Sequence, residues 1–206
     1  MTTFNEQYYA SNVWAGRTRW RGVAVQKAPT DLWVYQEIIH QVRPRLIIET
    51  GTAEGGSALF LADMMDIVCG RANVISIDIN PRVGWTDPRI TFVRGSSTAP
   101  EIIKPVRLTA QVTAGEGAVL VILDSDHRAP HVAAELALYS PLVTAGSYLI
   151  VEDTNINGHP VSPGWGPGPT EALLAWLPEH PEFEIDRERE KFMLTFNPGG
   201  YLRRVR

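Results

Sequence analysis

Short apolar runs alternate with helix-like segments over most of the chain. The runs cover residues 46–49, 74–78, 90–93, 119–123 and 147–151, and turn-forming residues follow most of them. The run at 119–123 is apolar throughout, which is typical of a strand buried on both faces of a sheet. We therefore predict that these runs are the strands of a largely buried sheet.

Segments with helical character separate the predicted strands. Residues 57–68, 101–112, 130–139 and 170–177 are predicted helices, with Pro105 as a candidate break in the second of them. Another helix precedes the first strand: apolar residues recur at helical spacing after Thr30, the predicted N-cap, and Pro44 ends the helix. Strands that alternate with helices favour right-handed crossovers and a parallel, doubly wound sheet.

The two ends of the chain depart from this alternation. Residues 183–187 and 192–196 are predicted strands joined without room for a helix, and residues 201–205 extend or complete the last strand. The fold class is therefore a Rossmann-like α/β fold with a mostly parallel sheet and a C-terminal antiparallel strand pair. Residues 1–29 are polar and aromatic without a clean period, and they predict a short helix or turn and then a covering arm. Residues 1–206 are expected to form a single domain.

Composition and charge exclude several classes of protein. Hydrophobic residues make up 44% of the 206 residues and charged residues 20%, which allows a packed core without metals or disulfides. The net charge of −4 disfavours a nucleic-acid partner, and no apolar run approaches the roughly 18 residues of a membrane span. The single cysteine, Cys69, and a polar N-terminal stretch without an apolar signal core favour a cytoplasmic protein.

The turn after the first predicted strand is the most informative stretch of the sequence. It reads E-x-G-x-x-x-G in Glu49, Gly51 and Gly55, and it matches neither of the common glycine-rich phosphate-binding patterns. Ligands of open α/β sheets bind where a strand's carboxyl end meets such a turn, and glycine lets the backbone approach them closely. A carboxylate at this place favours a ligand with a cationic group and hydroxyls over a polyphosphate.

Two further strand ends extend the predicted cofactor site. Asp78 closes the second strand, where a carboxylate can accept hydrogen bonds from a ribose diol, and Ser96 follows the third, where adenosine would lie. The alternatives are that Asp78 only shapes the turn before Asn80 and that Ser96 contacts no ligand. NAD would also use Asp78, but the first turn lacks the paired glycines that accept a pyrophosphate. The turn at Glu49, Gly51 and Gly55 resembles the first motif of class I S-adenosylmethionine-dependent methyltransferases. This resemblance implies S-adenosylmethionine as the cofactor, with Glu49 or nearby carbonyls at its amino group.

Acidic residues gather after the fourth and fifth predicted strands. Asp124 follows one strand, and Glu152 and Asp153 follow the other, so that the three side chains can converge at one edge of the sheet. Oxygen ligands of this kind suit Mg²⁺, and without a cation the carboxylates would repel one another. The alternative is that Asp124 caps a turn while Glu152 and Asp153 face solvent. Asp126 is a less direct candidate, either as the metal ligand in place of Asp124 or as a group that supports the ligands.

His127 is the candidate general base within this acidic cluster. A hydroxyl group must lose its proton to attack a methyl group well, and a positioned histidine typically contributes ~10²–10⁴ in rate. The alternative is that His127 only caps the helix that begins near Pro130. A zinc site of His127, His131 and Glu135 is disfavoured because Pro130 places His127 outside the regular helix.

A glycine- and proline-rich loop, residues 155–169, follows Asp153 directly. Its glycines give flexibility and Trp165 offers a flat apolar face, so that the loop is a predicted lid over a cyclic substrate such as a sugar. Ordinary surface packing is the alternative for Trp165.

Together these residues resemble the cephalosporin hydroxylase and rhamnosyl O-methyltransferase family of class I S-adenosylmethionine-dependent methyltransferases. The resemblance runs through residues 20–22, 27–33, 49–58, 123–127, 131–132, 135–136 and 146–154. It implies a Mg²⁺ ion held by Asp124, Glu152 and Asp153, and a proton taken by His127. Cofactor contacts are then expected at Glu49, Gly51, Thr52, Gly55, Ser57, Asp78, Ser96 and Asp124.

The sequence thus predicts a Mg²⁺-assisted O-methyltransferase that acts on a small-molecule hydroxyl acceptor, a sugar or a secondary metabolite, and it leaves a homo-oligomer open. Two alternatives remain at this stage. One is a non-catalytic cofactor-binding subunit that assists a partner hydroxylation or methoxylation enzyme, which the intact acidic cluster and His127 disfavour. The other is an enzyme of the same fold that uses the cofactor's positive charge without methyl transfer. The word hydroxylase implies no oxidation here, because the sequence offers no persuasive 2-His-1-carboxylate iron site.

Overall fold

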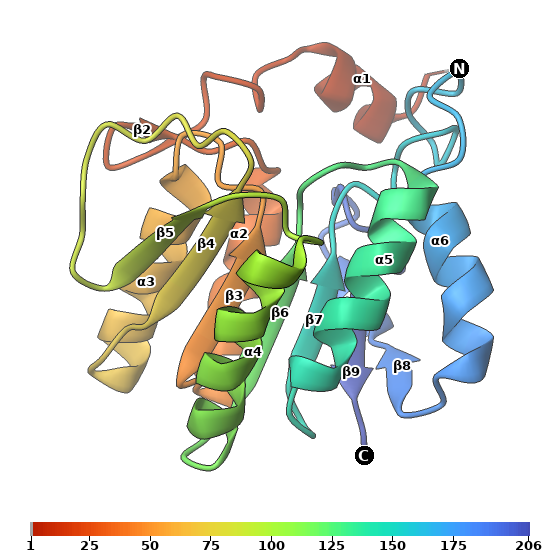
Figure 1. The fold of residues 1–206 in the computed structure, drawn as a ribbon. Coiled ribbons are helices and arrows are strands. Elements are labelled where there is room, and N and C mark those ends of the chain that lie inside the picture. The colour runs from red at the N-terminus through yellow and green to blue at the C-terminus, as the bar shows by residue number, and fades with distance from the viewer. Residues whose placement is uncertain (1) are drawn as a thin grey trace.

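A seven-stranded sheet forms the centre of the fold in the computed structural model, which describes residues 2–206 (Figure 1). Its strands are β3 (Leu46–Thr50), β4 (Val74–Asp78), β5 (Ile90–Arg94), β6 (Val119–Leu123), β7 (Tyr148–Val151), β8 (Phe183–Ile185) and β9 (Tyr201–Arg204). The order is β5-β4-β3-β6-β7-β9-β8, and neighbouring strands from β5 to β7 are parallel. β9 is antiparallel to both β7 and β8, which confirms the predicted fold class.

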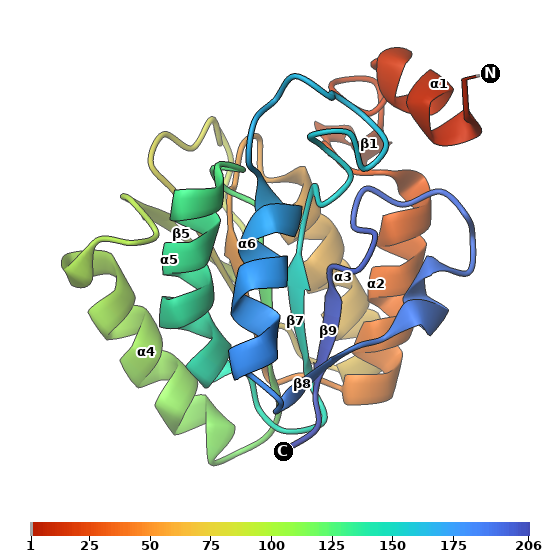
Figure 2. The ribbon, with the colours of Figure 1, turned by 90° about the vertical axis from the view of Figure 1, so that its right-hand side faces the viewer.

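Helices cover both faces of the sheet, as Figures 1 and 2 show from two sides. One layer contains α2 (Pro29–Val42) and α3 (Gly56–Cys69), and the other contains α4 (Pro100–Ala114), α5 (Ala129–Tyr139) and α6 (Pro169–Trp176). Each layer packs its apolar side chains against one face of the sheet in its own core cluster. Proline lies in the first turn of α2, α4, α5 and α6, where its missing N–H costs no helical hydrogen bond. α4 continues through Pro105, so the proline does not break it.

The two central strands explain why the apolar runs predicted the sheet so well. Every residue of β3 and of β6 is buried, because each strand has neighbours on both sides and helices on both faces. A strand in that environment favours apolar side chains, and β3 keeps them until its last two residues, the buried Glu49 and Thr50. The polar side chains that follow these strands therefore emerge together at one edge of the sheet.

The start of α2 differs from its predicted form. The N-cap is Ala28 and the helix begins at Pro29, so Thr30 lies inside the first turn. The Thr30 hydroxyl donates instead to the carbonyl of Leu194, at 2.5 Å. The prediction of Thr30 as N-cap was wrong because a partner far along the chain takes its hydroxyl.

The predicted strand at residues 192–196 is also absent from the described part of the chain. The chain leaves β8 at Ile185 and forms a short 3-10 helix, η3 (Arg187–Glu190). Beyond it, the N–H of Phe196 donates to the Asp31 carboxylate at 2.9 Å. Backbone groups of this segment thus bond side chains of α2 rather than a neighbouring strand, and β9 takes the place beside β8. Two further 3-10 turns, η1 (Ser140–Leu142) and η2 (Leu177–Glu179), follow α5 and α6.

The N-terminal segment crosses the edge of the sheet at which the parallel strands end (Figure 1). It contains α1 (Phe4–Ala10) and a small hairpin of β1 (Arg19–Trp20) and β2 (Val23–Ala24). Asp63 of α3 fastens the hairpin by accepting from Trp20 Nε1 at 2.8 Å and from Arg21 at 3.1 Å. Met1, the first residue of the predicted arm, lies outside the described residues.

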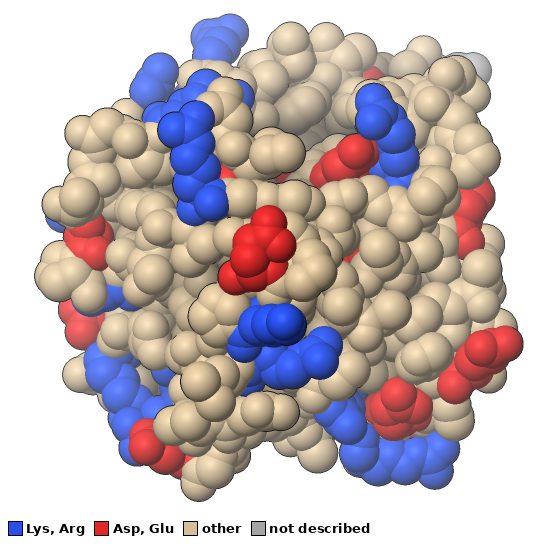
Figure 3. Space-filling view, in the orientation of Figure 1, with Lys and Arg blue, Asp and Glu red and all other residues tan. Residues whose placement is uncertain are grey.

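Positive and negative side chains are interspersed over the face drawn in Figure 3. None of the helices described within residues 2–206 is both long and apolar enough to cross a membrane.

Two glycines with the same backbone conformation test how tightly the turn after β3 is packed. Gly51 and Gly146 have φ of +87° and +83°, but a Cβ atom on Gly51 would lie 1.7 Å from the Asp124 carbonyl oxygen, whereas none at Gly146 meets an atom within 4 Å. Gly146→Ala should lower the free energy of unfolding by about 1–2 kcal/mol through backbone strain alone. Gly51→Ala should lower it by considerably more, as measured by urea denaturation. Equal losses in the two variants would show that the approach of β3 and β6 at Gly51 is not tight.

Candidate active site

A cavity of about 620 Å³ opens at the carboxyl ends of the parallel strands. This is the edge at which open α/β sheets bind their ligands. Eight of the predicted site residues line it: Gly51, Thr52, Ser57, Asp78, Ser96, Asp124, His127 and Asp153. The other three, Glu49, Gly55 and Glu152, do not belong to its lining and stand behind it. Most of the predicted site residues therefore surround the same cavity.

Asp78, at the end of β4, fixes the turn after β3 through hydrogen bonds. One Asp78 oxygen accepts from the N–H groups of Thr52 and Ala53, each at 2.9 Å, and the other accepts from the N–H of Asn80 at 2.7 Å. Asp78 therefore shapes both its own turn and the turn after β3. Its predicted contact with a ribose stays a prediction beside this structural role.

Glu49 acts from behind the cavity wall. Its side chain is fully buried and accepts hydrogen bonds from the hydroxyls of Ser57 and Ser76, the latter at 2.7 Å. Burial raises the pKa of Glu49 to about 7, against the opposing charge of Lys27 and the hydrogen bonds from the serines. Glu49 thus fixes Ser57, which does line the cavity.

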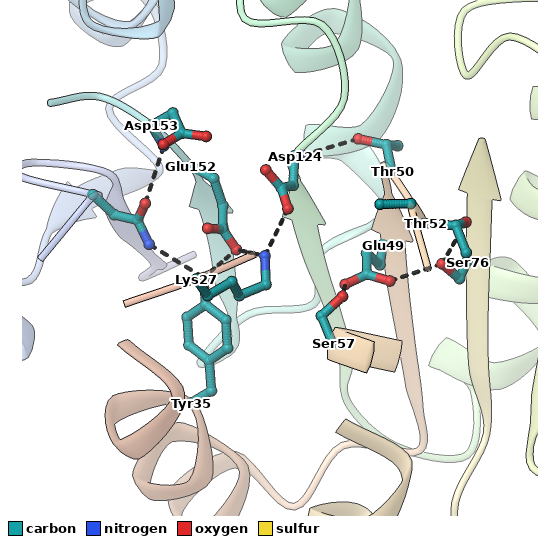
Figure 4. A network of polar contacts seen from close by, with 12 residues as sticks. Lys27, Tyr35, Glu49, Thr50, Thr52, Ser57, Ser76, Asp124, Glu152 and Asp153 are labelled. Atoms are coloured by element: carbon teal, nitrogen blue, oxygen red, sulfur yellow. Dashed lines mark hydrogen bonds and ion pairs between the residues drawn. The ribbon is translucent and has the colours of Figure 1, made fainter. Parts of the chain in front are cut away.

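Lys27 stands at the centre of the acidic cluster, as Figure 4 shows. Its side chain is buried, its Nζ lies 2.7 Å from Asp124 Oδ2, and it also donates to Glu152 Oε1. Burial alone would lower the pKa of Lys27, but the charges of Asp124 and Glu152 outweigh it and raise the pKa. Sequence reasoning placed Lys27 only within the covering arm, since nothing local marks a partner so distant along the chain.

A chain of buried hydroxyl and amide groups supports Glu152 from the other side. The Tyr35 hydroxyl donates to Glu152 Oε1 and accepts from Asn197 Nδ2 at 3.2 Å. Asn197 Oδ1 accepts from the N–H of Asp153 at 3.1 Å, and the Tyr201 hydroxyl donates to Asp31 Oδ1 at 2.8 Å. The spacing of Asp31 and Tyr35 was the available signal, because two polar groups four residues apart on a buried helix face need partners.

Asp124, His127 and Asp153 form the group best placed to hold a cation. One ligand atom from each lies within 4.8 Å of the others, and His127 Nε2 is 3.1 Å from Asp153 Oδ2. Burial lowers the pKa of His127, but Asp153, Asp124 and Glu152 raise it to a value above the usual one. Asp153 has a φ of +53°, a strained conformation for a residue with a side chain, and such strain gathers at functional sites.

Two neighbours of this group are engaged elsewhere. Asp126 lines the cavity but bonds the backbone and side chain of Arg128 and does not belong to the group. His131 Nε2 lies within hydrogen-bonding distance of the hydroxyls of Ser97 and Ser125, and Glu135 accepts from Ser125. Within residues 2–206, the candidate metal group contains neither His131 nor Glu135.

Aromatic side chains cover the acidic side of the cavity. Tyr9 and Trp14 come from the N-terminal segment with ring centroids 5.0 Å apart, and Trp165 comes from the loop that follows β7. The Trp165 ring lies 6.5 Å from that of His127 and is half exposed. Glu171 of α6 holds this loop by accepting from Asn157 Nδ2 at 2.9 Å and from the N–H of Gly168 at 2.6 Å.

Comparison with known proteins places this site in a family. The sequence pattern described as Rhamnosyl O-methyltransferase/CmcI matches residues 12–205. The rhamnosyl O-methyltransferase of Mycobacterium tuberculosis is 42% identical over 206 residues, which cover 97% of this chain and 82% of that protein. The protein of the same name from Mycobacterium leprae is 42% identical over 204 residues, covering 97% and 88%. The chain belongs to the rhamnosyl O-methyltransferase/CmcI family.

Solved structures agree with this family at the level of the fold. A CmcI structure described as Mg-SAM superposes with a TM-score of 0.66 at 21% identity, covering 92% of this chain and 77% of CmcI. The MycE methyltransferase in complex with Mg, SAH and mycinamycin VI gives a TM-score of 0.50 at 22% identity, covering 72% and 41%. The family and the class I methyltransferase fold expected from the sequence are thereby confirmed.

The support that Tyr35 gives to Glu152 can be measured against a matched tyrosine. Tyr35 and Tyr139 are both fully buried, but Tyr139 donates to the neutral carbonyl of Ser97, at 2.8 Å. A hydrogen bond to a charged group contributes about 1.5–3 kcal/mol and one between neutral groups about 0.5–1.5 kcal/mol. Tyr35→Phe should therefore lower the free energy of unfolding of this protein more than Tyr139→Phe does, as measured by thermal or urea unfolding. An equal loss of stability in Tyr139→Phe and Tyr35→Phe would contradict the claim that the Tyr35 hydroxyl gives Glu152 the support expected for a charged carboxylate.

Proposed function

We propose that this chain is an S-adenosylmethionine-dependent, Mg²⁺-assisted O-methyltransferase that acts on a hydroxyl group of a sugar or natural product. One observation carries the proposal: a single cavity joins the glycine turn after β3 and Asp78 to the group of Asp124, His127 and Asp153. A donor site and a reaction site would then face each other. The 42% identical relatives are rhamnosyl O-methyltransferases, which supports a sugar hydroxyl as the acceptor.

The donor half of the cavity has the chemistry that S-adenosylmethionine requires. At Gly51 the turn packs directly against the backbone of Asp124, and Thr52, Asp78 and Ser96 place polar groups around the cavity beside it. We assign the cofactor to Gly51, Thr52, Gly55, Ser57, Asp78, Ser96 and Asp124, with Glu49 acting through Ser57. When bound, the cofactor supplies an electrophilic methyl group.

The reaction half fits a hard divalent cation. Asp124 and Asp153 bring carboxylate oxygens together, and burial raises the pKa of each, as it does that of Glu152. Buried carboxylates of this kind are stabilised by positive charge. We assign Mg²⁺ to Asp124 and Asp153 of that group and to Glu152, which stands behind the cavity lining beside Lys27. The ion would supply positive charge that favours loss of a hydroxyl proton.

His127 would take that proton as the general base. Its imidazole borders the cavity, and the adjacent Asp153 carboxylate stabilises the protonated ring. The rings of His127 and Trp165 both line the cavity, with centroids 6.5 Å apart, so an acceptor held against Trp165 would lie near the imidazole. Positioning of acceptor and donor in one cavity would contribute much of the remaining rate enhancement.

Residues 1–206 would act as one methyltransferase domain, with residues 1–29 as the covering arm and residues 155–169 as the lid. Tyr9 and Trp14 of the arm and Trp165 of the lid line the cavity from two sides. Flat aromatic rings suit the apolar face of a sugar ring. The acceptor would therefore enter between the arm and the lid.

His127→Ala tests the general base. Turnover with a rhamnoside or related glycoside acceptor should fall by ~10²–10⁴, while calorimetry should show unchanged binding of S-adenosylmethionine. His131→Ala is the matched control, because His131 lines the same cavity but bonds Ser97 and Ser125. Unchanged turnover in His127→Ala, or an equal loss in His131→Ala, would remove the base assignment.

Trp165→Ala tests the acceptor wall. Loss of one aromatic contact, worth about 0.5–1.5 kcal/mol, should raise KM for the acceptor several-fold and leave KM for S-adenosylmethionine unchanged in steady-state kinetics. Trp33→Ala serves as the control, since Trp33 lies on α2, is 59% exposed and does not line the cavity. An effect confined to the cofactor's KM would contradict the assignment of Trp165 to the acceptor.

A further inference from the structure

One buried charge has no role in the proposed reaction. Lys27 lies between β2 and α2, in the N-terminal arm, yet its side chain reaches the ends of β6 and β7. Its relative exposure is 1%, and its Nζ donates to Asp124 and Glu152. A lysine is almost never buried this deeply unless it is paired, so the two carboxylates hold it there.

Lys27 uses only part of each carboxylate. It bonds Oδ2 of Asp124 and Oε1 of Glu152, and Tyr35 bonds the same Glu152 oxygen. Within residues 2–206, Oδ1 of Asp124 and Oε2 of Glu152 accept no hydrogen bond from a side chain or backbone group. Each carboxylate thus gives one oxygen to the lysine, and its other oxygen has no hydrogen-bond donor among residues 2–206.

The charges of the cluster explain why a resident cation is needed. Asp124, Glu152 and Asp153 are neighbouring carboxylates, of which Glu152 is buried and the other two are partly buried, and the charge of Lys27 offsets the repulsion among them. Removing one partner from a buried ion pair leaves an uncompensated charge and is strongly destabilising. The ammonium group therefore keeps Asp124 and Glu152 together when no divalent cation is bound.

We propose that Lys27 is the resident cation of the acidic site, a positioning residue that orders Asp124 and Glu152 and limits how tightly Mg²⁺ binds to them. The inference rests on the proposed metal site. Two cations that neutralise the same carboxylates oppose each other, and like charges a few ångström apart repel strongly even at an effective dielectric constant of about 20. Loss of the lysine charge should therefore make Mg²⁺ bind more tightly and make the fold depend on it.

The experiment compares the metal-stripped full chain with Lys27→Met, which removes the charge, and Lys27→Arg, which keeps it. Lys104→Met is the matched control, since Lys104 is exposed on α4. Each protein is titrated with MgCl₂ in a calorimeter at one fixed, mildly alkaline pH. Its Tm is then measured in EDTA and in saturating Mg²⁺, because a ligand of the native state raises stability in proportion to its affinity.

Lys27→Met should bind Mg²⁺ about ten-fold more tightly or better, and its Tm should rise more with Mg²⁺ than that of the unaltered chain. Lys27→Arg and Lys104→Met should stay close to the unaltered chain. Unchanged or weaker binding in Lys27→Met would overturn the inference, and so would equal tightening in Lys27→Arg, because packing rather than charge would then explain the effect.

Two other results have a defined meaning. Lys27→Met that folds in Mg²⁺ but not in EDTA supports the inference directly, and if it folds in neither, Lys27→Gln takes its place in the same titration with the same criteria. Absence of Mg²⁺ binding by the unaltered chain, both in heat and in Tm, would overturn the proposed metal site together with this inference. Binding by the unaltered chain with no response to Lys27→Met would overturn the inference alone.

Discussion

The ammonium group of Lys27, buried between the carboxylates of Asp124 and Glu152, is the interaction on which the rest of the site depends. Parallel strands that end side by side bring acidic side chains into one small volume, and carboxylates buried in this way need positive charge or hydrogen bonds. The lysine supplies the charge from a segment nearly one hundred residues away in sequence. It thereby ties the N-terminal arm to the ends of β6 and β7, and it makes the arm part of the site rather than a cover laid over it.

The same need for partners shapes the C-terminal part of the fold. Tyr35 and Asn197 continue the hydrogen bonding from Glu152 toward the segment before β9, and Asp31 accepts from the backbone of Phe196. That segment therefore passes along the N-terminal end of α2 as a loop, whereas its apolar residues alone predict a strand. The loop in turn supports the site, because Asn197 also accepts from the N–H of Asp153, a residue with a strained backbone conformation.

The parts of the structure that depend on local pattern could be predicted from the sequence, and those that depend on distant partners could not. The runs at 74–78 and 119–123 became β4 and β6 with the predicted bounds, because burial on both faces demands apolar residues in sequence. The predictions of Thr30 as an N-cap and of residues 192–196 as a strand were wrong because these two segments bond each other. The Thr30 hydroxyl donates to the carbonyl of Leu194, and the N–H of Phe196 donates to Asp31. In the site, the strand-end residues Asp78, Asp124 and Asp153 follow from topology, whereas the position of Lys27 follows from a contact that no spacing reveals.

The cavity is proposed to bind S-adenosylmethionine next to a Mg²⁺ site. Calorimetric titration of the metal-stripped chain with S-adenosylmethionine, with and without Mg²⁺, and with NAD as the competing cofactor, tests this proposal. The proposal predicts saturable binding of S-adenosylmethionine, a separate Mg²⁺ signal that is lost in Asp153→Ala, and no binding of NAD. Binding of NAD in place of S-adenosylmethionine, or binding of neither, would contradict it.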